Sequence, residues 1–180
     1  RTLYVSGFYW VVGEAHVGQY LIDFDGNIYT IPFMSPVRFA GCYIIREDWL
    51  EKLNLDMPDT LDDWYNVLKA FREQDPNGNG KADEIPFMVR EGRRRLKEFY
   101  NAWGIQEEFF IEDNTIKYGA IDPRMKEALT YLNKLYKEKL IDPEYITADT
   151  NVWQANFANE ISGATFDWGV RIDFLNNLLQ

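Results

Sequence analysis

The sequence has 180 residues, 46% of them hydrophobic, which is enough to bury the core of one well-packed domain and argues against a disordered chain. Its 19 basic and 29 acidic residues give a formal net charge of -10, which would repel a phosphate backbone and excludes nucleic acid as an expected partner. No apolar stretch approaches the roughly 20 residues that a membrane-spanning helix needs.

The first part of the chain carries one clear structural signal. Asp25-Gly26, placed between alternating apolar residues, predicts a β-hairpin over residues 20–32. The chain begins at Arg1 and not at a methionine, so we expect upstream sequence, including any export signal, to be missing. We expect residues 1–24 to pack on a domain formed by residues 25–180.

The next part of the chain alternates between strand and helix signals. Cys42, the single cysteine, lies in an apolar run over residues 41–45 that predicts a buried strand, where a lone thiol packs as a small hydrophobic group. A short helix is expected over residues 46–53. Thr60 and Asp63 then form a capping box, which predicts the start of a longer helix.

The remaining chain continues this alternation, and strands separated by helices of such lengths predict an α/β sandwich. Asp122-Pro123 opens the clearest helix, because proline suits the first helical position after an aspartate cap. Arg93, Arg94 and Arg95 form the only basic run, which we interpret as a solvated helix face without a function. Strands are expected over residues 85–89 and 162–166, and helices over residues 91–103, 150–159 and 168–179.

The most specific local pattern is a loop in which oxygen-bearing side chains alternate with glycines. Gly78 and Gly80 allow the positive φ angles that a tightly curled loop needs, so that alternate side chains can point inward. With Glu84 bidentate, the available oxygens fall within the roughly 6 to 8 that calcium takes, and suit magnesium less well. We therefore predict a Ca²⁺ site formed by Asp75, Asn77, Asn79, the Lys81 carbonyl, Asp83 and Glu84.

This loop matches the EF-hand pattern only in part. Gly80 stands at position 6, as that pattern requires, but position 12 is Pro86 where an EF-hand has a bidentate glutamate. A helix-loop-helix calcium sensor is therefore disfavoured, and a metal-free Asn-Gly loop stays open as the alternative.

Several sequence blocks occur in a defined order along the chain. They are Asp-Gly-Asn-Ile-Tyr-Thr-Ile-Pro from Asp25, Tyr-Ile-Ile-Arg-Glu-Asp-Trp-Leu from Tyr43, Pro-Asp-Thr-Leu-Asp-Asp-Trp from Pro58, the loop from Asp75 with Asp-Glu-Ile-Pro after it, and the stretches 125–142 and 157–166. In this order they resemble the extracellular solute-binding proteins of ABC importers, the superfamily that includes maltose-binding protein. The resemblance is closest to the subgroup with alginate-binding and Gram-positive lipoprotein members, in which a similar loop binds calcium.

The resemblance implies an α/β fold of the periplasmic-binding-protein-like type II, with this chain as one lobe of a two-lobe protein. The ligand would lie in the cleft between the lobes. The implied function is to bind a carbohydrate-like solute, which we expect to be an oligosaccharide, and to deliver it as a monomer to the permease of an ABC importer. Such a protein is not an enzyme, and it would be extracellular, periplasmic or lipid-anchored at the cell surface.

Aromatic residues make up 16% of the chain, and flat aromatic faces can stack on sugar rings. Because α/β sheets bind ligands beyond the carboxyl ends of their strands, residues at strand and helix ends are the candidates. We expect ligand contacts from Trp168, Asp167, Trp103 and Tyr100, and weaker ones from Arg38 and Phe39 near the hinge that the resemblance implies.

Two other functions remain as alternatives. A secreted glycoside hydrolase would need two carboxylates at a defined separation, which the sequence does not fix. The only histidine, His16, has no serine or cysteine motif around it. A calcium-dependent interaction module would expose a groove for partner helices, and the single loop with Pro86 at position 12 counts against it.

Overall fold

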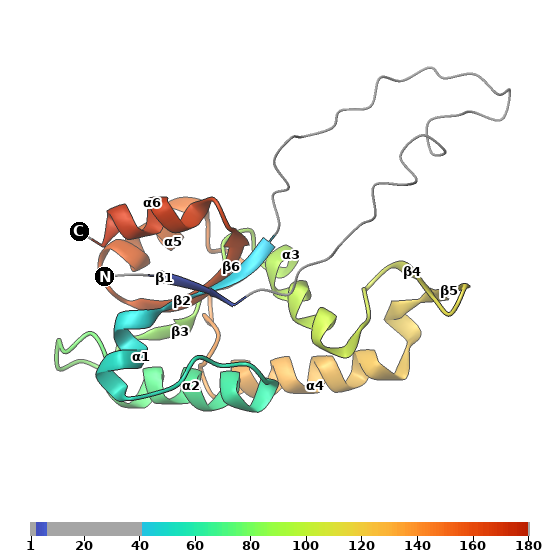
Figure 1. The fold of residues 1–180 in the computed structure, drawn as a ribbon, viewed down its shortest axis with the longest axis horizontal. Helices are drawn as coiled ribbons and strands as arrows, with labels where there is room; N and C mark the ends of the chain where they lie inside the picture. The colour runs from blue at the N-terminus through green and yellow to red at the C-terminus, as the bar shows by residue number, and fades with distance from the viewer. Residues whose placement is uncertain (1–2, 7–40, 180) are drawn as a thin grey trace, which may run out of the picture.

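The computed structural model describes residues 3–6 and 41–179 (Figure 1). The hairpin predicted over residues 20–32, His16, and the candidate ligand residues Arg38 and Phe39 lie outside these residues. Of the helices that the structure describes, none is both long and apolar enough to span a bilayer.

Four strands form a mixed sheet in the order β1-β2-β6-β3. They are β1 (Leu3–Ser6), β2 (Gly41–Arg46), β6 (Ser162–Trp168) and β3 (Ile85–Phe87). β2 runs antiparallel to both β1 and β6, whereas β3 runs parallel to β6. The carboxyl ends of β3 and β6 therefore lie at the same edge of the sheet, where Gly41 at the start of β2 pairs with Trp168.

Helices cover both faces of the sheet, so the predicted α/β sandwich is confirmed (Figure 1). Side chains of β2 contribute to a separate core on each face of the sheet, because successive side chains of a strand point in opposite directions. Ile45 packs in one core with Phe71, and Ile44 packs in the other with Trp153. The helices are α1 (Glu47–Leu53) and α2 (Leu61–Glu73) on one face, and α5 (Thr150–Ala158) and α6 (Arg171–Leu178) on the other.

The longer helices begin at the predicted caps. The Thr60 hydroxyl accepts the Asp63 N–H at 3.1 Å, and the Asp63 carboxylate accepts the Thr60 N–H at 2.9 Å, so the capping box at the start of α2 is confirmed. The Asp122 carboxylate accepts the Arg124 N–H at 2.9 Å, and Pro123 takes the first position of α4 (Pro123–Lys137).

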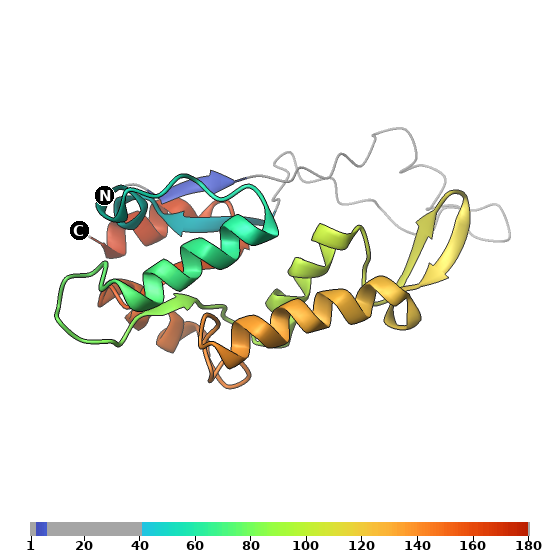
Figure 2. The ribbon, with the colours of Figure 1, turned by 90° about the horizontal axis from the view of Figure 1, so that it is seen from below.

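A second part of the domain extends away from the sheet along α4 (Figure 2). Its core contains Ile105, Met125 and Ala128. The elements around α4 are α3 (Arg93–Leu96), the 3₁₀ helices η2 (Lys97–Trp103) and η3 (Gly119–Ile121), and the antiparallel hairpin of β4 (Phe109–Glu112) and β5 (Thr115–Tyr118).

Several elements differ from the predictions: β3 ends two residues earlier and β6 two residues later than predicted. The helix predicted over residues 91–103 begins two residues later and soon becomes a 3₁₀ helix, because Glu91 and Gly92 form a turn with φ angles of 64° and 58°. The helix predicted over residues 168–179 begins at Arg171, since Trp168 ends β6. The β4–β5 hairpin is absent from the predictions altogether.

Candidate functional site

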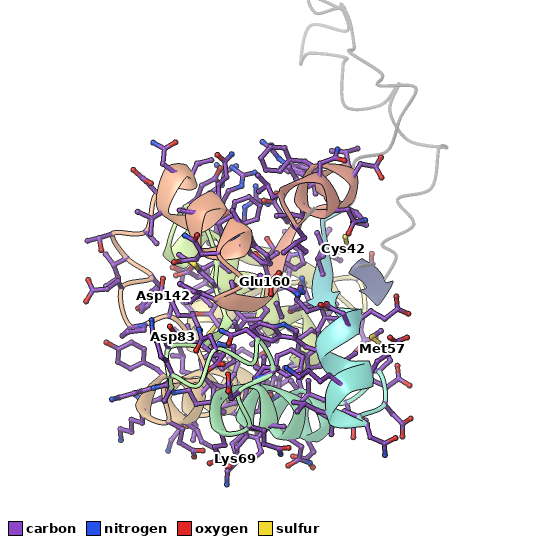
Figure 3. All side chains as sticks on the ribbon, turned by 90° about the vertical axis from the view of Figure 1, so that its left-hand side faces the viewer. Cys42, Met57, Lys69, Asp83, Asp142 and Glu160 are labelled. Carbon is purple, nitrogen blue, oxygen red and sulfur yellow. The ribbon has the colours of Figure 1, made fainter. Side chains whose placement is uncertain are left out.

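The predicted calcium loop joins the end of α2 to the start of β3, on the side of the domain that faces the viewer in Figure 3, where Asp83 is labelled. Gly78 and Gly80 have φ angles of 73° and 77°. These left-handed conformations are the ones that the sequence predicts for a curled loop. The predicted backbone curl is therefore present.

The oxygen atoms of the loop's side chains accept hydrogen bonds from the loop's own backbone. The Asp75 carboxylate accepts the three successive N–H groups of residues 78–80 at 3.0 to 3.1 Å. Asn77 Oδ1 accepts the Asn79 N–H at 2.9 Å, and Asn79 Oδ1 accepts the Lys81 N–H at 2.7 Å. These bonds hold the loop in one curled conformation.

Several hydrogen bonds tie the loop to other parts of the domain, including two from Arg72 of α2 to the carbonyls of Ala82 and Glu84. Lys52 of α1 donates to the Pro76 carbonyl at 2.6 Å. The Asn77 side-chain amide donates to the carbonyl of Glu160, just before β6, at 3.2 Å. The loop therefore connects α1, α2, β3 and the segment that leads into β6.

Glu84 is a buried side chain of the loop whose carboxylate lacks hydrogen-bond partners among the described residues. It is only 2% exposed, and neither of its carboxylate oxygens has a hydrogen-bond partner among the described residues. Burial raises the pKa of Glu84, and the nearby charges of Asp75 and Asp83 raise it further. Because a buried carboxylate without a partner is costly, a cation close to Glu84 would remove an unfavourable interaction.

The donor chemistry suits a hard cation, although the side chains are not closed around one point. Asn77 and Asn79 direct amide nitrogens toward Asp83, at 3.4 and 3.1 Å. Within residues 3–6 and 41–179, no group of three or more His, Cys, Asp or Glu side chains is arranged as a metal cluster. Rotation of an asparagine amide exchanges its nitrogen for its oxygen, so the residues present can supply oxygen ligands.

A second group of polar side chains lies at the sheet edge where β3 and β6 end. Asp167 of β6 is fully buried, and its two oxygens accept Arg90 Nε at 2.5 Å and Nη2 at 2.9 Å. The Trp168 N–H also donates to Asp167, at 2.7 Å. Cys42, opposite Asp167 in the sheet register, is buried as predicted, and burial raises its pKa to about 11. Asp167 thus holds Arg90 and the Trp168 backbone in place, and a contact with ligand stays a prediction.

The basic run does not form a uniform solvated face, so that interpretation is wrong for Arg95. The side chain of Arg94 is 72% exposed, whereas that of Arg95 is 9% exposed. Arg95 Nε lies 3.3 Å from Glu91 Oε2, and its Nη2 lies 3.6 Å from Asp167 Oδ1. Neighbouring helix residues point about 100° apart, so one arginine can face solvent while the next faces the sheet edge.

The side chain of Trp168 is partly exposed to solvent and has Arg95 next to its ring. Its side chain stands at the end of β6, and the residue is 37% exposed. The Arg95 guanidinium carbon lies 5.5 Å from the centroid of the Trp168 ring. An apolar ring that is open to solvent and flanked by a cation is suited to contact a polar, ring-shaped ligand.

The other two aromatic candidates lie in a different cluster. Tyr100 is buried beside Ile105. The Trp103 ring lies 5.7 Å from the ring of Tyr131, a residue of α4. The structure thus brings Trp168 and Asp167 together but places Tyr100 and Trp103 in the second part of the domain.

Sequence reasoning missed Arg90, Glu91 and Arg95 as members of the sheet-edge group. The available signal for Arg90 and Glu91 was that they follow directly on the predicted strand over residues 85–89, whose carboxyl end lies at this edge, whereas Arg95 lies further on, in α3.

Comparison with known proteins gives consistent matches. The family described as bacterial extracellular solute-binding protein matches residues 8–177. The chain is similar to the lipoprotein LipO of Bacillus subtilis, with 32% identity over 161 residues that cover 87% of this chain and 32% of LipO. It is also similar to the fructooligosaccharide ABC transporter substrate-binding protein FusA of Streptococcus pneumoniae, with 34% identity over 158 residues that cover 80% of this chain and 29% of FusA.

Solved structures match in the same way. FusA in complex with kestose has a TM-score of 0.71 at 32% identity, over 86% of this chain and 34% of FusA. A FusA EF-hand mutant in complex with fructo-nystose has a TM-score of 0.70 at 30% identity, over 86% of this chain and 35% of the mutant. The alginate-binding protein AlgQ2 without calcium ion has a TM-score of 0.65 at 35% identity, over 80% of this chain and 30% of AlgQ2.

The chain spans about a third of the length of these relatives. Its fold is the α/β, periplasmic-binding-protein-like type II fold, of which the described residues form one lobe. With a match that runs over residues 8–177, the chain belongs to the family of bacterial extracellular solute-binding proteins.

Proposed function

We propose that this chain is part of an extracellular solute-binding protein that binds an oligosaccharide and delivers it to the permease of an ABC importer. The protein acts as a monomer without catalysis, in the periplasm or lipid-anchored at the cell surface. Membership of the family supports this proposal, as do relatives named for the binding of fructooligosaccharide and of alginate. The observation that carries it is the exposed ring of Trp168 at the carboxyl edge of the sheet.

The sheet edge has the properties that sugar binding requires. A tryptophan ring offers a flat apolar face for stacking, and its backbone is fixed by the hydrogen bond to Asp167. A surface that is ordered before the ligand arrives loses less conformational entropy on binding. The chain also leaves β1 after Ser6 and returns at Gly41, which pairs with Trp168, so the connection between β1 and β2 ends at this edge.

In this proposal the rest of a full-length protein forms the other wall of the cleft. The chain covers about a third of FusA and of LipO, so most of such a protein lies outside the 180 residues. A ligand held between two walls loses much of its contact area when one wall is removed. Affinity therefore belongs to the full-length protein rather than to this lobe alone.

A glycoside hydrolase is the less favourable alternative. Its mechanism needs one carboxylic acid that donates a proton and a second carboxylate at a defined separation. The two carboxylates of the sheet-edge group, Glu91 and Asp167, are both paired with the Arg90 guanidinium, and Asp167 is fully buried. Neither is arranged as a proton donor to a glycosidic oxygen.

Titration calorimetry of the full-length protein with a panel of oligosaccharides tests the proposal. We expect binding without release of reducing ends, and at least tenfold weaker binding by residues 1–180 alone, with circular dichroism used to establish that the isolated lobe is folded. Equal affinity of a folded isolated lobe would contradict the two-wall cleft. Failure of the full-length protein to bind any oligosaccharide, or cleavage of the ligand, would contradict the proposed function.

We also propose that the loop between α2 and β3 binds one calcium ion. The support is the buried, unpartnered carboxylate of Glu84, together with the curled backbone and the supply of oxygen donors around it. Relatives whose structures are described as an EF-hand mutant and as lacking calcium ion add to this support. The ligands are Asp75, Asn77, Asn79, the Lys81 carbonyl, Asp83 and Glu84.

The role of this ion is structural. Three carboxylates lie within one short loop, and a divalent cation converts their mutual repulsion into attraction. The loop already contacts α1 through Lys52 and the start of β6 through the Glu160 carbonyl, so an ordered loop fastens these elements to one another. A sensor would need an element that opens when calcium binds, and here the loop ends in β3 of the central sheet.

A further inference from the structure

The ion pairs at the sheet edge form one connected network that carries an excess of positive charge. It contains the guanidinium groups of Arg90, Arg94 and Arg95 and the carboxylates of Glu91 and Asp167. Arg90 takes the strongest share, with a bidentate contact to Asp167 and a further contact to Glu91 at 2.7 Å. Arg94 and Arg95 share the other oxygen of Glu91, and Arg95 has one longer contact with Asp167.

Of the two nearly buried guanidiniums of this network, Arg95 has the longer contacts with carboxylates. Its closest acidic oxygen is Glu91 Oε2 at 3.3 Å, which Arg94 also approaches, at 3.4 Å. Its contact with Asp167 Oδ1 is longer, at 3.6 Å, and that oxygen already accepts two hydrogen bonds. The buried Nε of Arg95 has no hydrogen-bond partner among the described residues.

The backbone before Arg95 also carries strain. Glu91, a residue with a side chain at Cβ, has a φ angle of 64°, and Gly92 follows with 58°. A left-handed conformation at a residue other than glycine is unfavourable, and such residues cluster at functional sites. This turn puts Glu91 in contact with all three guanidiniums of the network and leads directly into α3, which carries Arg95.

The Arg95 guanidinium lies over the ring of Trp168 but not in close stacked contact with it. Its guanidinium carbon is 5.5 Å from the ring centroid, whereas carbon atoms in stacked contact are about 3.5 to 4.0 Å apart. The cation is therefore further from the ring than in close stacking but within the roughly 6 Å of a cation–π contact, so a cationic group and an apolar ring lie next to each other. A cation held nearly buried with only long contacts to anions is in place for an additional anion.

We infer that Arg95 and Trp168 form a subsite for an acidic sugar, with the sugar ring against Trp168 and its carboxylate paired with Arg95. The inference rests on the proposed function, because it names the ligand class of the same sheet-edge site. A carboxylate matches the planar guanidinium and supplies the negative charge that the network lacks. The subsite thus selects oligosaccharides that contain a uronic acid over neutral ones, even though the chain as a whole is acidic.

The test compares ligands that differ only in charge. The full-length protein is titrated in a calorimeter with oligogalacturonates and oligomannuronates, and with the methyl esters of the same oligosaccharides. We expect at least one of the two acids to bind at least tenfold more tightly than its ester. We also expect added salt to weaken the binding of the acid and to leave that of the ester unchanged.

Arg95→Gln is the diagnostic variant, and Arg94→Gln is its matched control. Both changes remove one positive charge from neighbouring positions of α3, but only Arg95 lies beside Trp168. Arg95→Gln should abolish the preference by lowering the affinity for the acid to that for the ester, and Arg94→Gln should keep the preference. Arg95→Lys, which retains a charge, should restore part of the preference.

The outcomes separate this inference from the proposed function. If the wild-type protein binds acids and esters equally, or if Arg94→Gln and Arg95→Gln lose the same amount of preference, the acidic subsite is wrong. Oligosaccharide binding of any kind would in that case still support the proposed function. The wild-type comparison of acid with ester decides the question even if Arg95→Gln does not fold.

Discussion

Trp168 is held in place before any ligand arrives. Its N–H donates to Asp167, Asp167 is fixed by the bidentate contact of Arg90, and Arg95 stands beside the ring. Asp167 and Trp168 lie on β6, Arg90 lies shortly after β3 and Arg95 lies on α3, so the two parallel strands and the helix that follows β3 determine their positions. The ring itself takes little part in either core of the sandwich. Its removal should therefore affect binding more than folding.

Trp168→Ala should lower the affinity of the full-length protein for its oligosaccharide by about 1 to 3 kcal/mol, or roughly 5- to 150-fold, without unfolding it. Trp103→Ala is expected to weaken binding to a lesser degree. Because the Trp103 ring packs against Tyr131, this second change should also lower the melting temperature. Calorimetry and thermal melting of both variants measure the two effects. A Trp168→Ala protein that melts much earlier but binds normally would assign Trp168 to the core.

Local conformation could be predicted from the sequence where one short segment contains the whole pattern. The curl of the loop over residues 75–84 is of this kind, because it depends on Gly78 and Gly80 within that segment, whereas the metal-binding role of its side chains stays a prediction. Arg95 is the opposite case, since the sequence shows only a run of three arginines. Its burial depends on the turn at Glu91 and on a contact with β6, more than 70 residues away along the chain. Composition and spacing carry no information about that contact.

Among the elements, the β4–β5 hairpin is attached to the rest of the domain by the packing of Phe110 against the second core and by a group of ion pairs. Most of its apolar side chains point to solvent, including Phe109, Ile111 and Ile116. Arg124 near the start of α4 donates to Glu112 of β4 at 2.8 Å and to Asp122 at 2.8 Å. Lys117 of β5 also pairs with Glu112. These contacts fix the hairpin at the amino end of α4.

The pH dependence of the hairpin follows from these ion pairs. Hydrogen bonds from Arg124 lower the pKa values of Glu112 and Asp122 to about 2 each, and Lys117 also lowers that of Glu112. Because the pKa values are lower in the folded than in the unfolded state, the pairs stabilise the hairpin above the ordinary carboxyl values near 4. That stabilisation decreases as the pH falls from about 4 and is lost once it has passed below about 2.

Arg124→Gln should therefore loosen the hairpin already at neutral pH. We expect the NMR chemical shifts of residues 109–118 to move toward random-coil values in this variant, and in the wild-type protein only as the pH approaches 2. Lys126→Gln, an exposed position of the same helix, is the charge-matched control and should leave the hairpin unchanged. Native hairpin shifts in Arg124→Gln would show that packing, and not charge, holds this element.

Elements could be predicted where a cap or an apolar run marks them. Thr60 with Asp63 and Asp122 with Pro123 gave the starts of α2 and α4, because each cap is completed by residues next to it. The β4–β5 hairpin was not predicted because most of the apolar side chains of its strands are exposed. Its signal was the pair Asp113-Asn114, whose φ angles of 50° and 57° fit a two-residue hairpin turn.

Across the whole lobe, the two candidate sites lie at opposite ends of the same strands. The calcium loop precedes β3, and its contact with the Glu160 carbonyl lies just before β6. Arg90 follows β3, and Trp168 is the last residue of β6. The central sheet thus separates the proposed ion from the proposed ligand. Calcium should change the stability of the lobe and leave its ligand contacts unaltered as long as the protein is folded.

The proposed calcium ion should raise the melting temperature of this lobe by about 5 to 10 °C in the full-length protein. An ion that binds only the folded state stabilises it by RT ln(1 + [Ca²⁺]/Kd), or about 2.7 kcal/mol at a hundredfold excess over Kd. For a cooperative unit of 150 to 250 residues, each kcal/mol shifts the melting temperature by about 2 to 4 °C.

Asp83→Asn removes one of the loop's carboxylates and should abolish the shift, whereas Asp56→Asn, an exposed change of the same charge outside the loop, should retain it. Calorimetric melting with excess calcium and with a chelator measures the effect. If the wild-type transition does not move after elemental analysis has shown the metal to be gone, the loop is held by its own hydrogen bonds and the buried Glu84 needs another explanation.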